Sequence, residues 1–175
     1  QTSNLYDRGL DRNPANHQPL TPLGFLTRAA AVYPHETAVI HGGLRYTYGE
    51  FYERCRRLAS ALKGRGVGPG DTVALLAPNV PAMLEAHHGV PMAGAVLNAL
   101  NTRLDGDTIA FILEHGEAKI LITDRELSPA VGHALAKIRR PILVIDIDDP
   151  LADGGELLGE MDYEAFLAEG DPAGD

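Results

Sequence analysis

The sequence predicts an α/β fold in which helices flank a mostly parallel sheet, with a small hairpin near the N-terminus. After residue 70, short apolar runs alternate with helix-forming segments through four rounds. The links between them are short, and right-handed crossovers between such units make the strands parallel. With 175 residues, 45% of them hydrophobic and 22% charged, the chain has the composition of a soluble protein of about one domain.

The N-terminal part of the sequence predicts an arm, a helix and a hairpin. The first 22 residues are polar and contain three prolines, which indicates an extended arm. Apolar residues then recur at helical spacing from Phe25 to Val32, and Pro34 ends the predicted helix. Two strand-like runs, 38–41 and 44–48, lie on either side of a Gly-Gly turn and predict a hairpin.

A longer helix is predicted directly after the hairpin. Thr47 and Glu50 have the spacing of a capping box, in which each residue satisfies a free amide of the other. Glycines between Gly64 and Gly70 end this helix, and they precede a strand. A phosphate-binding glycine loop has the opposite order, so we expect these glycines to form a turn. One buried stripe is expected along the helix, formed by Phe51, Cys55, Leu58 and Leu62.

The alternating region supplies four strands and the helices between them. We expect Asn79 to cap the first of these helices, with Pro81 in its first turn. Asp105 or Asp107 is expected to cap the second helix, and Ser128 to begin the third. The expected strands are residues 72–77, 94–97, 119–123 and 141–145.

Acidic residues are concentrated toward the C-terminal end. Eleven of the 24 Asp and Glu residues lie at or after Asp146, and no Lys or Arg follows Arg140. Residues 1–145 therefore hold 15 basic and 13 acidic residues, and a nucleic-acid-binding protein would need a basic stripe instead. The expected parts are an extended arm at 1–22, an α/β subdomain at 23–147, and an acidic connector at 148–175 that contains one short helix at 163–167.

Simple features argue against several classes of protein and site. No apolar run reaches the roughly 18 residues of a membrane-spanning helix, and the charged N-terminal segment does not predict a signal peptide. A single cysteine, Cys55, indicates a reducing compartment, for which we expect the cytoplasm. His87 and His88 are adjacent on a predicted helix and cannot share a metal from one face. The acidic cluster at 146–149 lacks the glycine and distal Glu of a calcium loop, so we expect a solvated strand end.

Polar side chains follow the predicted strands, at the sheet edge where α/β proteins bind ligands. Asn79, Asn98 and Asn101 each come just after a strand, although each also suits an ordinary turn or cap. Arg103 lies in the same loop as Asn101, and its guanidinium offers a fork of donors for a phosphate or carboxylate. An ordinary surface arginine is the alternative at that position. Composition and periodicity alone thus predict an α/β domain with a polar loop at the strand ends.

An ordered set of motifs resembles the AMP-forming acyl-CoA synthetases of the adenylating superfamily. The resemblance extends over about residues 19–145 and corresponds to the first part of the large N-terminal domain of those enzymes. Three further stretches are similar to the branch of plant acyl-activating and benzoate–CoA ligase-type enzymes. The family motifs are RYTYGE at 45–50, RLASAL at 57–62, VGPGDTVA at 67–74, APN at 77–79 and GAVLNALNTRL at 94–104, and the branch stretches are PLTP at 19–22, PNVPAM at 78–83 and VPMAG at 90–94.

The resemblance implies ATP, Mg²⁺ and CoA as cofactors or substrates, a small carboxylic acid as the second substrate, and a place in fatty acid metabolism. The Ser/Thr/Gly-rich phosphate loop, the adenine-binding segments, the acidic ribose residue, the hinge and the C-terminal domain with its catalytic Lys are not in these 175 residues. We therefore expect an N-terminal fragment that has no ligase activity alone. Its incomplete domain would expose apolar surface and favour self-association.

The resemblance assigns one site residue. In benzoate-type CoA ligases of the family, the Arg of an Asn-x-Arg-Leu segment contacts the 3′-phosphate of CoA, and Arg103 matches it. No catalytic residue and no metal ligand is assigned. Two alternatives remain open at this point, namely a stand-alone α/β binding or scaffold domain and part of a carrier-protein adenylation enzyme.

Overall fold

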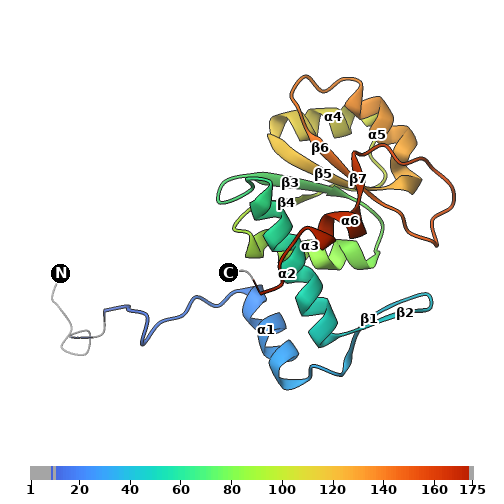
Figure 1. Cartoon of the computed structure of the whole chain (residues 1–175). Helices are drawn as coiled ribbons and strands as arrows, with labels where there is room; N and C mark the ends of the chain where they lie inside the picture. Colours follow the sequence, from blue (N-terminus) through green and yellow to red (C-terminus); the bar gives the residue numbers. More distant parts are fainter. Residues whose placement is uncertain (1–8, 10, 174–175) are drawn as a thin grey trace.

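The computed structural model describes residues 9 and 11–173 and confirms the predicted fold class. One sheet has five parallel strands in the order β4-β3-β5-β6-β7, and a separate two-stranded hairpin, β1-β2, stands apart from it (Figure 1). The strands are β1 (Thr37–His41), β2 (Leu44–Thr47), β3 (Thr72–Leu76), β4 (Val96–Ala99), β5 (Ala118–Asp124), β6 (Leu143–Ile147) and β7 (Met161–Asp162). The helices are α1 (Pro22–Val32), α2 (Tyr48–Gly64), α3 (Pro81–Met92), α4 (Gly106–His115), α5 (Ser128–Leu135) and α6 (Tyr163–Ala168).

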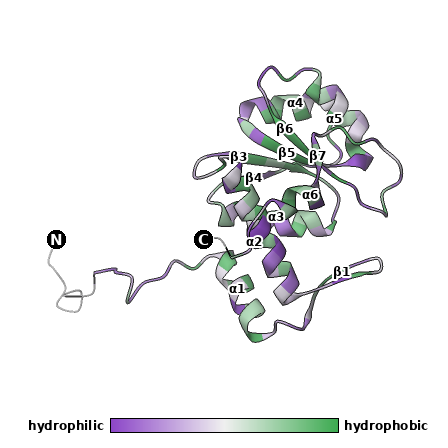
Figure 2. Ribbon diagram, viewed as in Figure 1, coloured by the Kyte–Doolittle hydropathy of each residue, from purple (hydrophilic) through white to green (hydrophobic). Residues whose placement is uncertain are grey.

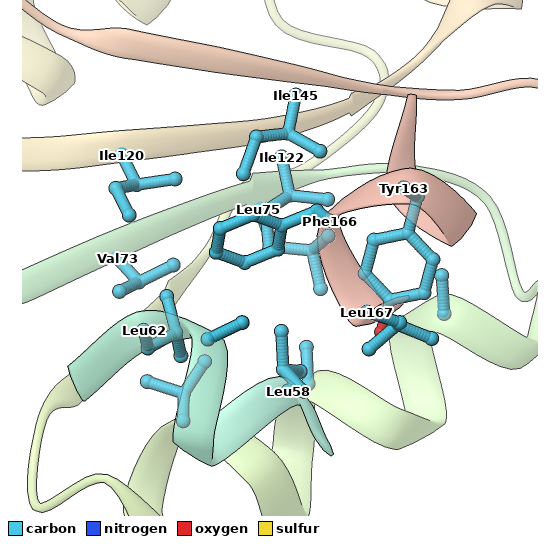
Figure 3. Close-up of a cluster of buried hydrophobic side chains, with 14 of the residues drawn as sticks. Leu58, Leu62, Val73, Leu75, Ile120, Ile122, Ile145, Tyr163, Phe166 and Leu167 are labelled. Atoms are coloured by element: carbon cyan, nitrogen blue, oxygen red, sulfur yellow. The ribbon is translucent and has the colours of Figure 1, made fainter. Parts of the chain in front are cut away.

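The five-stranded sheet has a separate core on each face. Helices α2, α3 and α6 pack on one face, and α4 and α5 pack on the other. Figure 2 shows hydrophobic residues along the strands between these two layers. Because both faces are covered, the strands are nearly continuous apolar runs, as predicted from the sequence. In the larger core, residues of α2, β3, β5, β6 and α6 point toward one another (Figure 3).

Helix α2 forms as its sequence predicts. The Thr47 hydroxyl oxygen accepts a hydrogen bond from the Glu50 amide at 3.2 Å, and the Glu50 carboxylate accepts one from the Thr47 amide at 2.8 Å. The predicted capping box is therefore confirmed. The expected stripe is buried as well, and Cys55 has no exposed surface. The glycines after α2 form a turn that leads into β3, also as expected.

Two strands begin later than the sequence predicts. The second strand was expected at 94–97, whereas β4 spans Val96–Ala99. Gly94 has φ +82°, and its amide bonds back to Pro91, so it closes α3 instead of starting the strand. The last strand was expected at 141–145, whereas β6 spans Leu143–Ile147. Proline lacks an amide hydrogen for the ladder, which moves the start of β6 past Pro141.

The cap of α3 is a further correction. Asn79 was expected to cap this helix, but the N-cap is Val80, and no side chain caps the helix there. Pro81 fixes φ and has no amide to satisfy, so it occupies the first helical position. The preceding residue must then be extended, and Asn79 lies one position too early. At α4, Asp105 is the cap, because its carboxylate accepts a hydrogen bond from the Thr108 amide at 2.8 Å.

The acidic C-terminal segment is not merely a connector. Strand β7 adds to the edge of the sheet, and α6 packs into the larger core. Tyr163, Phe166 and Leu167 are 3%, 0% and 2% exposed, so α6 is an integral part of this face. The short helix was predicted at 163–167, but its burial was not. Residues 174–175 of the expected connector, and residues 1–8 and 10 of the expected arm, lie outside the described residues.

The described part of the arm, residues 11–21, is exposed and leads into α1. Among the described residues, no helix has both the length and the apolar composition that crossing a bilayer requires.

A buried ionic network joins three helices on the larger core. The Glu85 carboxylate of α3 is fully buried and accepts hydrogen bonds from Arg54 Nε of α2 at 2.6 Å and from the Tyr163 hydroxyl of α6 at 2.9 Å. Arg54 also pairs with Glu164 of α6, at 2.5 Å and 2.9 Å. The Arg54 guanidinium lies 4.8 Å from the centre of the Tyr46 ring, so strand β2 joins the network too.

Burial shifts the pKa values of this network, and the neighbouring charges oppose that shift at Glu85 and Arg54 but add to it at Tyr163. Burial raises the pKa of Glu85, and the hydrogen bonds and charge of Arg54 counteract that rise. Burial lowers the pKa of Arg54, but hydrogen bonds to Glu164 and Glu85 outweigh burial and raise it overall. Burial, followed by the neighbouring Glu85 charge, raises the pKa of Tyr163, which keeps this phenol protonated as a donor.

Replacement of the α2 capping residue should cost stability, whereas the matched change at α1 should not. Thr47→Ala removes the hydroxyl, which accepts a hydrogen bond from the Glu50 amide and donates one to the Glu50 carboxylate, and it should lower the free energy of unfolding by about 0.5–2 kcal/mol. Thr21 is the N-cap of α1 but makes no side-chain capping bond, so Thr21→Ala should change it by less than about 0.5 kcal/mol. Urea unfolding followed by circular dichroism measures both values. Equal losses in the two variants would contradict the role of the capping box.

The two carboxylates that share Arg54 should differ sharply in importance. Glu85→Gln removes the charge opposite a guanidinium that lies against the core, and should lower the free energy of unfolding by about 3–5 kcal/mol. Glu164→Gln is the same chemical change at a carboxylate that is 66% exposed, and should cost at most about 1 kcal/mol. Thermal or urea unfolding of the two variants provides the comparison. A loss of similar size in both would show that burial of Glu85 is not what makes the pair important.

Candidate functional site

The strands of the main sheet are parallel, so their carboxyl ends meet at one edge. The candidate polar residues lie along this edge. Asn101 and Arg103 follow β4, Asn79 follows β3, Asp124 ends β5, and Asp148 follows β6. Ligands of open α/β proteins bind at such an edge, because the loops that leave the strands there can differ without disturbing the sheet.

The loop after β4 holds Arg103 in a defined backbone position. The Leu100 amide continues the ladder to Leu75 at 2.8 Å, and Leu100 is buried. The Asn101 side-chain oxygen accepts a hydrogen bond from the Arg103 amide at 2.9 Å. The Arg103 side chain is exposed, and among the described residues its guanidinium has no hydrogen-bond or ion-pair partner. A fixed backbone thus carries a free cationic fork, which suits an anionic ligand.

The three asparagines of the strand ends do not come together. Only Asn101 is bonded to the Arg103 loop. Asn98 lies inside β4, because the strand begins two residues later than predicted. Its side chain is half-buried beside the C-terminal end of α4. Asn79 is exposed and lines a hollow of 490 Å³ between α3 and the hairpin. The prediction that Asn101 follows a strand is therefore confirmed, and the same prediction for Asn98 is wrong.

A second hollow, of 460 Å³, opens at the same edge of the sheet. Its walls are the hairpin, the start of α3, the loop 148–151 after β6 and the start of α6, and we call it the hairpin groove. Arg54 and Tyr163 of the ionic network line it as well. The network therefore fixes one wall of the groove.

The loop after β6 holds the hairpin close to the sheet. Both carboxylate oxygens of Asp149 lie within 3.0 Å of His41 Nε2 at the end of β1. Arg125 Nε pairs with Asp148 at 3.1 Å. Leu151 packs on Gly42, where a Cβ atom would lie 2.9 Å from the Leu151 side chain. The turn favours glycine because of its φ of +53°, whereas the contact alone does not require it, since the tip of the exposed Leu151 side chain can shift.

The sequence predicts that the acidic cluster at 146–149 is a solvated strand end, and this prediction is wrong for two of its three carboxylates. Asp146 is 2% exposed and accepts a hydrogen bond from the Gly159 amide at 2.6 Å, and Asp149 is 8% exposed. Only Asp148 is substantially exposed. His87 and His88 each bond to a carbonyl of their own helix, α3. No group of three potential metal ligands was found among the described residues.

The interactions of Glu85 and His41 were not predicted from the sequence. Glu85 lies among ordinary helix residues of α3. Only its position on the buried face of that helix could have indicated that its carboxylate is buried. Its partners, Arg54 and Tyr163, are 31 and 78 residues away in the chain. His41 was likewise read only as the end of a strand, and its partner Asp149 is 108 residues away.

Comparisons with known proteins agree with the fold and the motifs. The profile of the AMP-binding enzyme family matches residues 26–172. The chain is 46% identical over 175 residues to a peroxisomal acetate/butyrate–CoA ligase of Arabidopsis thaliana, with 93% of this chain and 31% of the relative covered. It is 42% identical over 166 residues to a peroxisomal benzoate–CoA ligase of the same plant, with 90% and 28% covered.

A solved structure shows the same arrangement of elements. A benzoate CoA ligase from Burkholderia xenovorans superposes with a TM-score of 0.74 at 30% identity, over 86% of this chain and 29% of that one. The chain spans about 30% of the length of these relatives. The family profile matches far more than half of the chain, and the solved structure shares its fold. The chain therefore belongs to the AMP-binding enzyme family.

Proposed function

We propose that this chain is the N-terminal portion of an ATP-dependent, AMP-forming acyl-CoA synthetase. The family match over residues 26–172 is the observation that carries the proposal. It is supported by the relatives named as acetate-, butyrate- and benzoate–CoA ligases, which the chain matches over most of its own length. In this proposal the chain supplies one sheet of a larger catalytic domain, and other segments of the protein bind the nucleotide.

The proposed reaction has two steps. A carboxylate oxygen attacks the α-phosphorus of ATP, forming an acyl-adenylate and releasing pyrophosphate. The thiolate of CoA then attacks the acyl carbon, and AMP leaves as the acyl-CoA thioester forms. The first step is needed because a carboxylate is a poor electrophile. Mg²⁺ would neutralise the phosphates of ATP, and the proposal assigns it no ligand among the described residues.

Arg103 is the residue of this chain that we assign to ligand binding. Its guanidinium would hold the 3′-phosphate of CoA, because a guanidinium matches the geometry and charge of a phosphate. The fit is supported by the exposed side chain, the absence of another partner among the described residues, and the Asn101 hydrogen bond that fixes the loop. Arg103 would thus position CoA at the sheet edge and take no part in adenylate formation.

The proposal also covers partners and location. We place the protein in the cytoplasm, since the buried Cys55 suits a reducing compartment. We propose no nucleic-acid partner, because residues 1–145 are nearly neutral and the remaining residues are acidic. Five of the relatives are named as peroxisomal, so fluorescence microscopy of the tagged complete protein decides the location. For the isolated chain we propose self-association, because Phe25 and Phe111 are 66% and 64% exposed. Sedimentation velocity across a concentration series tests it.

Substitution of Arg103 in the complete protein should affect CoA and leave the first half-reaction unchanged. Arg103→Ala removes a charge-assisted contact of about 1.5–3 kcal/mol, so the KM for CoA should rise tenfold or more. Pyrophosphate exchange with the carboxylate and ATP should keep its rate. Dephospho-CoA lacks the 3′-phosphate. The unmodified protein should therefore have a higher KM for it than for CoA, whereas the variant should not distinguish the two. Arg28→Ala, an exposed arginine of α1, is the matched control and should change neither value.

The isolated 175-residue chain should not catalyse either step. Its sequence lacks the phosphate loop of the family. Carboxylate-dependent pyrophosphate exchange should therefore stay at the level of the blank, whereas the complete protein should show it. The comparison requires a folded chain, which circular dichroism checks. Turnover of ATP by the purified chain would contradict the proposal.

A further inference from the structure

The loop between β4 and α4 contains charges of both signs, yet its arginine is paired with neither of the nearby acids. Asp105 and Asp107 follow Arg103 by two and four residues. Opposite charges this close in the chain attract each other. Even so, the exposed Arg103 guanidinium has no hydrogen-bond or ion-pair partner among the described residues. The two carboxylates must therefore be held by other groups.

Both carboxylates are engaged by α4 and by the region of α5. Asp105 is the N-cap of α4, where it accepts a hydrogen bond from the Thr108 amide at 2.8 Å. Asp107, in the first turn of α4, lies 2.8 Å from His133 Nε2 of α5 and also pairs with Lys137. Neither acid neutralises Arg103, so the loop presents an uncompensated positive charge at the sheet edge.

The side chain that fixes this turn, Asn101, is neutral, although an aspartate would form the same bond. The Asn101 Oδ1 atom accepts a hydrogen bond at 2.9 Å from the Arg103 amide, two residues further on. Asp and Asn side chains both form turns of this kind. In this chain three carboxylates accept from the amide two residues further on, namely those of Asp124, Asp149 and Asp171. An amide at 101 differs from a carboxylate there in lacking the negative charge that would attract the Arg103 guanidinium.

We propose that Asn101 is a positioning residue that determines how strongly the protein prefers CoA to dephospho-CoA. Its amide oxygen fixes the loop that carries Arg103, and its neutrality leaves the guanidinium free for the 3′-phosphate. This inference rests on the proposed function, which assigns Arg103 to that phosphate. Asn101 acts through Arg103 and takes no part in either chemical step.

Substitution by aspartate in the complete protein separates the charge of residue 101 from its hydrogen bond. Asn101→Asp keeps the acceptor and adds a carboxylate that pairs with Arg103, so the KM for CoA should rise about fivefold or more. The KM for dephospho-CoA should change by less than about twofold, because that substrate does not use the guanidinium. Pyrophosphate exchange and kcat at saturating CoA should stay the same. A residue that only shaped the turn would instead be replaced by aspartate without effect.

Substitution by alanine tests the hydrogen bond itself. Asn101→Ala removes the acceptor, so the Arg103 amide should exchange with deuterium about two- to tenfold faster, whereas Asn101→Asp should keep it slow. Mass spectrometry with fragmentation to single residues measures the exchange in the complete protein. The KM for CoA should rise about two- to tenfold in Asn101→Ala. In the Arg103→Ala protein the same substitution should add no further change, because Asn101 then has no guanidinium to position.

Asn13 provides the matched control. Its Oδ1 atom accepts a hydrogen bond from the Ala15 amide at 2.9 Å, which is the same bond at the same spacing. It belongs to the exposed part of the arm, residues 11–21, which extends away from the sheet (Figure 1). Asn13→Asp and Asn13→Ala should leave both KM values unchanged. Asn13→Ala should speed exchange of the Ala15 amide alone, which shows that the measurement detects the loss of one such bond.

Three outcomes would overturn the inference. Asn101→Asp with an unchanged preference for CoA would show that neutrality at 101 is not needed. An unchanged exchange rate of the Arg103 amide in Asn101→Ala would show that the side chain does not hold the loop. A further rise in the KM for CoA when Asn101→Ala is added to Arg103→Ala would show that Asn101 does not act through the guanidinium.

The same assays distinguish this inference from the proposed function. A complete protein that forms no acyl-CoA would refute the proposed function and the inference together. An active protein in which Arg103→Ala raises the KM for CoA, but in which the Asn101 variants behave like the unmodified protein, would refute the inference alone.

Discussion

The buried Glu85 carboxylate is the constraint on which the arrangement of helices depends. A carboxylate removed from water is costly unless donors replace its hydration, and Glu85 has no exposed surface. Its donors come from Arg54 of α2 and Tyr163 of α6. All three helices must therefore be in place together, because removing any one leaves a charge or an acceptor without partners. This requirement joins a segment near residue 163 to a helix that begins at residue 48.

The same network connects the core to the candidate binding surfaces. Arg54 reaches Tyr46 of the hairpin and Glu164 at the start of α6, and all three line the hairpin groove. The shape of the groove therefore follows from an interaction that is mostly buried. The Arg103 loop lies after β4, at the other end of the strand order, and depends on local hydrogen bonds instead. The two surfaces can thus be changed independently, since they share no contact in the network.

Local chemistry explains which parts of the fold could be predicted from the sequence. The capping box, the α2 stripe and the hairpin turn were predicted because all their interacting groups lie within a few residues. The starts of β4 and α3 were misplaced, because Gly94 and Pro81 each impose a backbone conformation that a count of apolar residues does not register. The packing of α6 was missed, because six residues in an acidic segment give too short a periodic pattern. Of the site, Asn101 and Arg103 were found from their place after a strand, whereas His41 and Glu85 have partners too distant in the chain to leave a local signal.

The division between buried charge and exposed charge bears on how such a domain can carry function. Glu85 and Arg54 satisfy each other, so their charges hold the fold and have little left to offer a ligand. Arg103 is the reverse case: its backbone is fixed while its side chain meets no partner among the described residues. A charge that is already neutralised cannot gain much by binding, whereas a free guanidinium on a rigid loop loses little on binding a phosphate. The function proposed for this sheet edge therefore relies on a side chain that the fold positions and leaves unpaired among the described residues.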